Sequence, residues 1–402
     1  QFRVALPNVT TLPKFFREQG YWTAGMGKVF HPVAYEGKTD DVAGGSWSAP
    51  YYHAHGTSGS NMSMCWTVNP SAESTFTDNM LASHAVLILQ MAAANVSITP
   101  FFVAVGLHRP HLPWDVPQKF YDLYPEDEIE LADHHTMPLQ YNVTGAEPWS
   151  WDPQSGPRHC GPLKQMGTTL PEFALVPDTV AKKFRRGYYA AVSQTDENFG
   201  TVMAELDRLK LSETTIITFI GDHGWQLGDL GEFGKKTNFE RATRAPFIIR
   251  DPTKTNIGTH SSALVEFVDL MPTLVDLSGF GVPQTCDVDS TKVALCTEGK
   301  SLVAIMTNPG PQTYNWSDAA FMQYAHCMHD EGIWHDACAD PQEPKVMGYA
   351  IRTRRWRYVE WVGFNKNTTP PTIMWDEMHG TELYDHTSAD TVENVAESQN
   401  LV

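Results

Sequence analysis

Basic residues are scarce in this chain of 402 residues: 29 Lys and Arg stand against 47 Asp and Glu, for a net charge of −18 at pH 7. Nucleic-acid binding needs clustered cations, so nucleic acid is not expected as a partner. No run of about 18 uncharged apolar residues occurs, which argues against a membrane span. With 42% hydrophobic residues, the chain is not a disordered polymer or a coiled coil. A few cations in one pocket would still suit an anionic substrate.

The N-terminus lacks the basic and apolar segments of a signal peptide, and it begins at Gln1 rather than Met. We therefore expect a processed or incomplete chain. Other features nevertheless indicate the secretory pathway, because six N-x-S/T sequons predict surface glycosylation. They begin at Asn8, Asn61, Asn95, Asn142, Asn315 and Asn367. The alternative is that these are chance sequons in a cytosolic protein.

Cysteine is also sparse, with six residues and no C-x-x-C pair. An even number in short loops predicts disulfides and an oxidising compartment, either lysosomal or extracellular. The expected local pairs are Cys286–Cys296 and Cys327–Cys338, which leaves Cys65 and Cys160 for a long-range pair. A zinc site is the alternative, but the Cys and His residues near position 327 lack a partner pair at finger spacing.

Helical and strand patterns alternate along the first 300 residues, which predicts an α/β fold with a mostly parallel central sheet sandwiched by helices. Apolar runs predict buried strands, and apolar periodicity predicts helices. The expected strands cover 23–29, 100–105, 215–220 and 245–250, and the expected helices cover 11–20, 78–95, 178–209 and 265–277.

The pattern changes after about residue 285, where alternation over 349–362 suits a β-hairpin. We expect a smaller C-terminal subdomain that contains an antiparallel sheet. The Pro- and Gly-containing stretch near 308–311 marks the boundary. The predicted division is a catalytic domain over 1–308 and an α+β subdomain over 309–402.

Three polar clusters follow predicted strands, at 27–32, 106–111 and 221–225, the last continuing to Lys235. Ligands of open α/β sheets bind beyond the carboxyl ends of strands, so we expect the clusters to form one site. Each cluster alone is equally typical of a solvated turn. Lysines can neutralise a sulfate or phosphate, histidines can donate protons, and Asp222 offers hard oxygen ligands for Ca²⁺ or Mg²⁺.

Several of these segments resemble the sulfatase family of the alkaline phosphatase-like superfamily. Residues 20–31, GYWTAGMGKVFH, are similar to its second signature, and residues 108–111 match an H-K-P-H stretch. Residues 222–239 resemble the metal segment, with His223 typical of the branch that acts on sulfated uronic-acid sugars. Residues 348–353, 361–365 and 382–385 match the C-terminal strands.

The resemblance implies an alkaline phosphatase-like fold and a sulfuric ester hydrolase that acts on sulfated glycosaminoglycan-type sugars. It assigns sulfate binding to Lys28, His31 and Lys235, the leaving oxygen to His111, one Ca²⁺ to Asp222 and His223, and the sugar pocket to His108 and Trp225. In this family a cysteine converted to formylglycine supplies the hydrated aldehyde that attacks sulfur.

The family's nucleophile motif, C-x-P/A-x-R, has no match in this sequence, since Cys65 is followed by Trp66-Thr67-Val68-Asn69. We expect it on an N-terminal segment before Gln1, either cleaved into a separate partner chain or not represented. A second departure is Asp229-Leu230, where the family carries an acidic residue and His. Two alternatives stay open: a catalytically inactive sulfatase-like glycoprotein with a structural or binding role, and a two-metal phosphodiesterase or phosphonate hydrolase.

Overall fold

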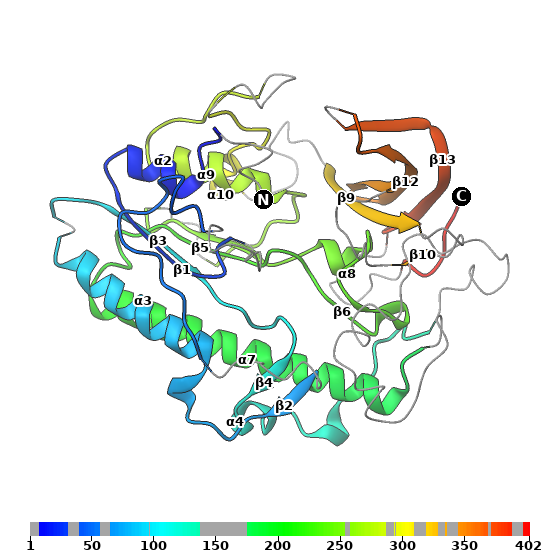
Figure 1. Cartoon of the computed structure of the whole chain (residues 1–402), viewed down its shortest axis with the longest axis horizontal. Helices are drawn as coiled ribbons and strands as arrows, with labels where there is room; N and C mark the ends of the chain where they lie inside the picture. Colours follow the sequence, from blue (N-terminus) through cyan, green and yellow to red (C-terminus); the bar gives the residue numbers. More distant parts are fainter. Residues whose placement is uncertain are drawn as a thin grey trace.

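A computed structural model describes most of the chain (Figure 1). The described residues are 8–30, 40–56, 65–95, 97–136, 175–253, 258–286, 293, 295–308, 319–328, 334–335, 345–368, 371–387 and 397–402. Within these ranges no helix is long and apolar enough to cross a membrane. Several predicted positions lie outside them, namely His31, Asn61, Asn142, Cys160, Asn315 and Cys338.

The described elements between residues 12 and 307 form an α/β body in which helices cover both sides of short central strands (Figure 1). On one side lie α3 (Thr77–Ala93) and α7 (Asp178–Arg208); on the other lie α2 (Leu12–Glu18), α9 (Leu270–Leu277) and α10 (Val303–Thr307). The central strands are β1 (Trp22–Gly27), β3 (Phe101–Gly106), β5 (Ile217–Ile220) and β8 (Phe247–Arg250).

Strand β3 contributes side chains to both helical layers. Val103 and Val105 pack with Leu81 of α3, whereas Phe102 stacks on Phe16 of α2 with ring centroids 5.1 Å apart. Successive side chains of a strand point to opposite faces, so a continuous apolar run suits a strand enclosed by two layers of helices. The parallel pairing of β3 with β1 aligns Gly27 with Gly106.

The strands β5 and β8 form an antiparallel pair and are less buried than their apolar sequences predict. Ile220 and Ile248 are 40% and 57% exposed. Each of these strands hydrogen-bonds to one neighbouring strand within the described part of the chain. A strand with an uncovered edge leaves some of its apolar side chains accessible.

Helix boundaries follow the predicted signals. Thr11 caps α2, accepting a hydrogen bond from the backbone N–H of Lys14 at 3.4 Å, and Gly20 follows the helix with φ +88°. The segment expected as one helix over 265–277 is a short 3₁₀ turn, η5 (Phe267–Asp269), followed directly by α9. Pro272 lies in the first turn of α9, where it costs no helical hydrogen bond.

The C-terminal region contains a five-stranded antiparallel sheet in the order β10-β9-β11-β12-β13. Its strands are β9 (Ala319–Met328), β10 (Trp334–His335), β11 (Val346–Thr353), β12 (Trp356–Asn365) and β13 (Thr372–Asp385). The predicted hairpin is confirmed as β11 and β12. Val359 and Trp361 of β12 are fully buried, so the sheet has its own apolar core.

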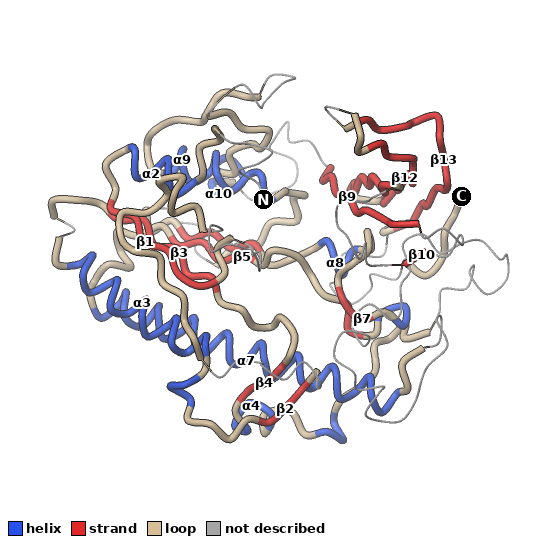
Figure 2. Tube along the Cα trace, viewed as in Figure 1, coloured by secondary structure: helices blue, strands red, loops and turns tan. Residues whose placement is uncertain are grey.

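Further short elements lie between residues 66 and 243, and loops run from the end of β5 toward β7 (Figure 2). These elements are β2 (Trp66–Val68), η1 (Glu73–Thr75), β4 (Trp114–Val116), α4 (Gln118–Tyr121), η2 (Glu126–Glu128), β6 (Gln226–Leu227), η4 (Asp229–Gly231), β7 (Phe233–Gly234) and α8 (Glu240–Thr243). β2 and β4 pair in parallel, and β6 and β7 form a small hairpin.

The cysteine prediction is confirmed for Cys286 and Cys296, whose sulfur atoms lie 2.05 Å apart. Cys65 is also disulfide-bonded, and its expected partner falls outside the described residues. Cys327 contributes its backbone to β9, and its pairing stays a prediction.

Three of the six sequons begin at described residues. Asn8, Asn95 and Asn367 are all exposed at the surface. Glycan transfer requires an accessible Asn side chain, so these positions are compatible with the predicted glycosylation.

Candidate active site

The carboxyl ends of β1 and β3 lie side by side and position Lys28. The Lys28 backbone N–H donates a 2.7 Å hydrogen bond to the Gly106 carbonyl. Gly27 has φ +71°, and a Cβ at Gly106 would lie 2.2–2.5 Å from the Lys28 backbone. Two glycines are therefore required where the strands end, because any side chain would push Lys28 away. The Tyr51 hydroxyl also donates to the Gly27 carbonyl at 2.8 Å.

The loop that follows β5 brings Asp222 close to Lys28. The Asp222 Oδ2 lies 3.9 Å from the Lys28 Nζ, and its Oδ1 lies 3.5 Å from the His223 Nε2. The Lys28 side chain is only 16% exposed, whereas that of Asp222 is 69% exposed. The carboxylate is thus open to solvent or a ligand while the lysine stem is packed.

The β6–β7 hairpin returns the chain to this site. Its turn has positive φ values at Gly228 (+99°) and Leu230 (+55°). After the hairpin, the Lys235 Nζ lies 2.6 Å from the His223 Nε2 and 5.9 Å from the centroid of the Trp225 ring. Residues separated by more than ten positions therefore meet because two short strands fold back on each other.

The turn after β3 supplies His111. Its backbone N–H donates to the His108 carbonyl at 2.9 Å, and its Nδ1 lies 2.6 Å from the Leu112 carbonyl oxygen. The buried guanidinium of Arg109 donates to the His111 carbonyl at 3.3 Å. With Nδ1 engaged by a carbonyl, Nε2 is the nitrogen of His111 that can serve a ligand.

Burial and nearby charges shift the pKa values of His111 and Lys235. Partial removal from water, together with the charges of Lys235, Lys28 and Arg109, lowers the pKa of His111 to about 4. His111 is nevertheless exposed, so its imidazole is accessible although protein atoms and cations lie nearby. Burial and the nearby Lys28 also lower the pKa of Lys235. Two lysines beside a histidine concentrate positive charge and form a site suited to an anion.

An aromatic wall borders the cationic groups. The Trp225 ring packs near Trp114, with centroids 6.3 Å apart, and lies roughly parallel to Tyr188 of α7 at 6.5 Å. Burial raises the pKa of Tyr188 to about 12, so this tyrosine stays neutral. Such a wall offers an apolar face to the ring of a bound sugar.

Asp222 fits a calcium ion as one of several ligands, because it is accessible and offers hard oxygens. Calcium takes six to eight oxygen ligands, so further oxygens would have to complete the shell. His223 fits less well, since its Nδ1 contacts the Gly224 carbonyl at 2.8 Å and its Nε2 contacts Lys235. The metal roles of both residues stay predictions.

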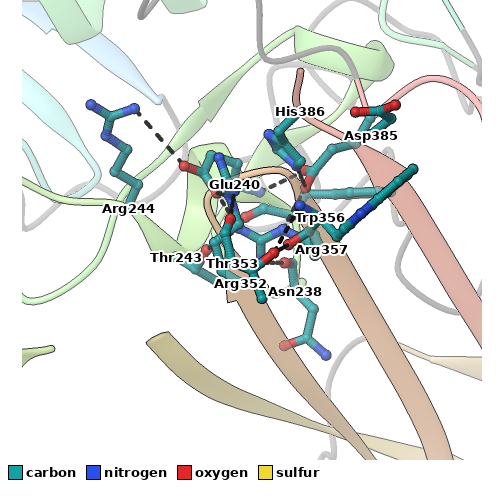
Figure 3. A network of polar contacts seen from close by, with 12 residues as sticks. Asn238, Glu240, Thr243, Arg244, Arg352, Thr353, Trp356, Arg357, Asp385 and His386 are labelled. Carbon is teal, nitrogen blue, oxygen red and sulfur yellow. Dashed lines mark hydrogen bonds and ion pairs between the residues drawn. The ribbon is translucent and has the colours of Figure 1, made fainter. Parts of the chain in front are cut away.

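A second group of acidic and histidine side chains lies where the body meets the C-terminal sheet: Glu240, His386 and Glu397. Figure 3 shows the guanidinium groups of Arg352 and Arg357 close to Glu240. The Arg352 Nε lies 3.0 Å from Glu240, and the Arg357 Nε lies 2.5 Å from Glu397. The arginines occupy the carboxylate oxygens, so these residues form an ion-pair cluster rather than a metal centre.

Sequence patterns did not identify several residues that support the site, among them Tyr51, Asp78 and the role of Arg109. Tyr51 and Asp78 contact the backbone of segments that are distant in the sequence, which no local pattern predicts. Arg109 donates to carbonyls of its own turn, and its role depends on its burial. Leu230, the second departure from the family pattern, is 3% exposed and packs with Phe239 and Tyr384. Its side chain is therefore part of a small apolar core rather than of the site's rim.

Comparisons with known proteins identify the family of the chain. The sulfatase family model matches residues 5–280, and a model for the N-sulphoglucosamine sulphohydrolase C-terminal region matches residues 221–396. The chain is 33% identical to iduronate 2-sulfatase of Homo sapiens, over 95% of this chain and 76% of that protein. It is 28% identical to a sulfatase of Formosa agariphila, over 84% of this chain and 66% of that protein.

Solved structures show the same fold at lower sequence identity. A protein in complex with its substrate D-glucosamine-2-N,6-O-disulfate has a TM-score of 0.65 and 19% identity, covering 97% of this chain and 77% of its own. A phosphonate monoester hydrolase from Silicibacter pomeroyi has a TM-score of 0.66 and 17% identity, covering 97% and 75%. With a family model that matches well over half of its length, the chain belongs to the sulfatase family, whose members hydrolyse sulfate esters.

Proposed function

We propose that this protein removes sulfate from sulfated uronic-acid units of glycosaminoglycan-type sugars, with 2-sulfated iduronate as the substrate class. The observation that supports the proposal best is the meeting of Lys28, His111, Asp222 and Lys235 at one edge of the body. The identity to iduronate 2-sulfatase supports the choice of sugar.

In this proposal the two lysines bind the sulfate group. The charge of Lys28 lowers the affinity of Lys235 for a proton, and an anion placed between the two lysines relieves that repulsion. A sulfate ester is permanently negative, so it can be held at acidic and neutral pH alike. Charge that develops on its oxygens as the ester bond breaks is then neutralised by the same ammonium groups.

His111 is proposed to move the proton at the leaving oxygen. Its low pKa in the free site is set by partial removal from water and by nearby cations. A bound sulfate offsets that positive charge and raises the pKa of the imidazole, so the protonated form becomes accessible when substrate is present. His111 would then donate the Nε2 proton to the departing sugar oxygen.

His108 and Trp225 are proposed to border the sugar, and His31 to contact the sulfate. Asp222, with His223 beside it, would contribute to a calcium site that polarises the sulfate oxygens. The nucleophile is proposed to be a formylglycine carried by the N-terminal part of the reading frame. We further propose that the protein is glycosylated and acts in lysosomes or outside the cell.

Sulfate release by the protein expressed from its full reading frame tests the proposal. The substrate is a 2-sulfated iduronate glycoside, and mass spectrometry establishes that formylglycine has formed. Release that requires Lys28 and His111 is the expected result. No release by protein that carries formylglycine would reject this substrate, and no release from any sulfate ester would favour the inactive, structural alternative.

A further inference from the structure

The buried carboxylate of Asp78 accepts hydrogen bonds from the turn that carries His108 and His111. Asp78 lies in the first turn of α3 and is 3% exposed. Its Oδ1 accepts the backbone N–H of His108 at 2.9 Å, and its Oδ2 accepts the backbone N–H of Arg109 at 2.8 Å. The two oxygens of one side chain thus hold two successive residues of the turn.

Asp78 also orients the His108 ring. The His108 Nδ1 lies 3.2 Å from the Asp78 Oδ1, so the ring donates from Nδ1, and Nε2 is left for a ligand. No other residue in the described ranges hydrogen-bonds the His108 ring. Burial by itself would raise the pKa of Asp78, but the bonds from His108 and Arg109 outweigh it and keep the pKa below its ordinary value.

Arg109 extends the support to His111. Its guanidinium is buried and donates to the carbonyls of His111, at 3.3 Å, and Asp115, at 3.5 Å. Its own carbonyl accepts the Thr195 hydroxyl of α7 at 3.1 Å. The chain of contacts therefore runs from α3, through Asp78 and Arg109, to the backbone of the residue that faces the lysines.

We propose that Asp78 is a positioning residue of the active site, which sets the ring orientation of His108 and the place of His111 relative to the sulfate ester. The inference rests on the proposed function of that site. Asp78 does not touch the substrate itself; it acts through the 108–111 turn.

Asp78→Asn is a sharp test because the amide is nearly the same size but carries one acceptor oxygen. It can pair with one of the two backbone N–H groups and must present its own NH₂ to the other. Asp269→Asn is the matched control. Asp269 is 4% exposed and accepts two backbone N–H groups, from Glu266 at 2.8 Å and Lys300 at 2.7 Å, but it bonds none of the residues of the 108–111 turn.

The kinetic experiment measures kcat and KM for sulfate release by the full reading frame, corrected for the folded fraction of each variant. Asp78→Asn is expected to lower kcat/KM about tenfold or more, with kcat reduced through His111 and KM raised through His108. Asp269→Asn is expected to lower the melting temperature with kcat/KM within about twofold of wild type. A loss for Asp78→Asn no larger than that of the control would overturn the proposal.

A second measurement does not depend on activity. In protein labelled with ¹⁵N-histidine, the His108 signals are identified by their loss in His108→Gln. Asp78→Asn is expected to shift the His108 Nδ1 resonance, whereas Asp269→Asn leaves it in place. An unchanged His108 signal in Asp78→Asn would refute the positioning role. If wild-type protein released no sulfate while this shift occurred, the proposed function would fail and the Asp78 contact would stand.

Discussion

At the residue scale, the site depends on cations that are held close together against their mutual repulsion. The Lys28 side chain is mostly buried next to the ends of β1 and β3, and Lys235 directly follows the β6–β7 hairpin. The protein as a whole is strongly acidic, with a net charge of −18. The cationic site is therefore a local exception, and the negative surface around it would disfavour weak binding of anions elsewhere.

Replacing Lys235 with methionine tests how its charge acts on the sulfate ester and on His111. Removing the ammonium group is expected to lower kcat/KM for sulfate release about 100-fold, as for other donors to a developing oxyanion. The Lys235 charge lowers the pKa of His111, so its removal should raise that pKa above about 4. The profile of kcat/KM against pH, which reports the free enzyme, would show its alkaline limb, on which His111 loses the proton that it donates, moving to higher pH.

The matched control is Lys119→Met, because Lys119 pairs with Glu73 and Glu197 on the surface of the molecule. It should leave both the rate and the alkaline limb unchanged. An alkaline limb that stays in place in Lys235→Met would show that His111 does not titrate under the influence of Lys235.

At the element scale, the site is positioned by strand ends and a tight hairpin rather than by long secondary structure. The parallel pairing of β1 with β3 places Lys28 next to the Gly106 carbonyl. The connection is backbone to backbone, so Lys28 follows any displacement of β3. This close approach is possible only because both strands end in glycine.

Gly106→Ala tests that requirement. Its Cβ would lie within 2.5 Å of the Lys28 backbone, which forces the two strand ends apart. We expect the free energy of unfolding to fall by about 1–3 kcal/mol, as in other overpacked sites. We also expect kcat/KM to fall more than the lost stability explains. Thermal unfolding and steady-state kinetics on the same preparation measure both.

Gly200→Ala serves as the counterpart. Gly200 lies inside α7, and a Cβ there would meet nothing within 4 Å. Alanine favours a helix over glycine, so this variant should gain about 0.5–1 kcal/mol with unchanged kinetics. Equal effects of the two substitutions would contradict the close-approach explanation.

At the scale of the whole molecule, a buried ion-pair cluster fastens the C-terminal sheet to the α/β body. Arg357 of β12 is 1% exposed and bonds Glu240 of α8, Glu397 near the C-terminus and the Asn238 carbonyl. Burial alone would lower the pKa of Arg357, but the two carboxylates raise it. Through α8 the cluster also reaches the active site, since Ala242 accepts the Gly224 N–H at 2.8 Å.

Arg357→Met should therefore lower the free energy of unfolding strongly. It leaves Glu240 and Glu397 buried without their main partner, which costs about 3–5 kcal/mol in comparable cases. Combining it with Glu240→Gln should restore part of this loss, because one uncompensated charge is removed. Chemical denaturation of the single and double variants gives the coupling between the two residues.

An exposed ion pair in the same sheet provides the comparison. Arg355 pairs with Asp385 at 2.9 Å, and its side chain is 58% exposed. Arg355→Met should cost less than about 1 kcal/mol. If both arginine variants lost the same stability, the buried cluster would not be what holds the sheet in place.

The sequence by itself determined much of this protein. Apolar periodicity and capping residues located α2, α3 and α7, and alternation located the β11–β12 hairpin, because these signals are local. Motif spacing located the active-site candidates, since each follows a strand. Only the tertiary structure decided how they are held. Asp78, Tyr51 and Glu240 bond residues 24 to 117 positions away, and such contacts depend on how the layers pack rather than on any neighbouring residue.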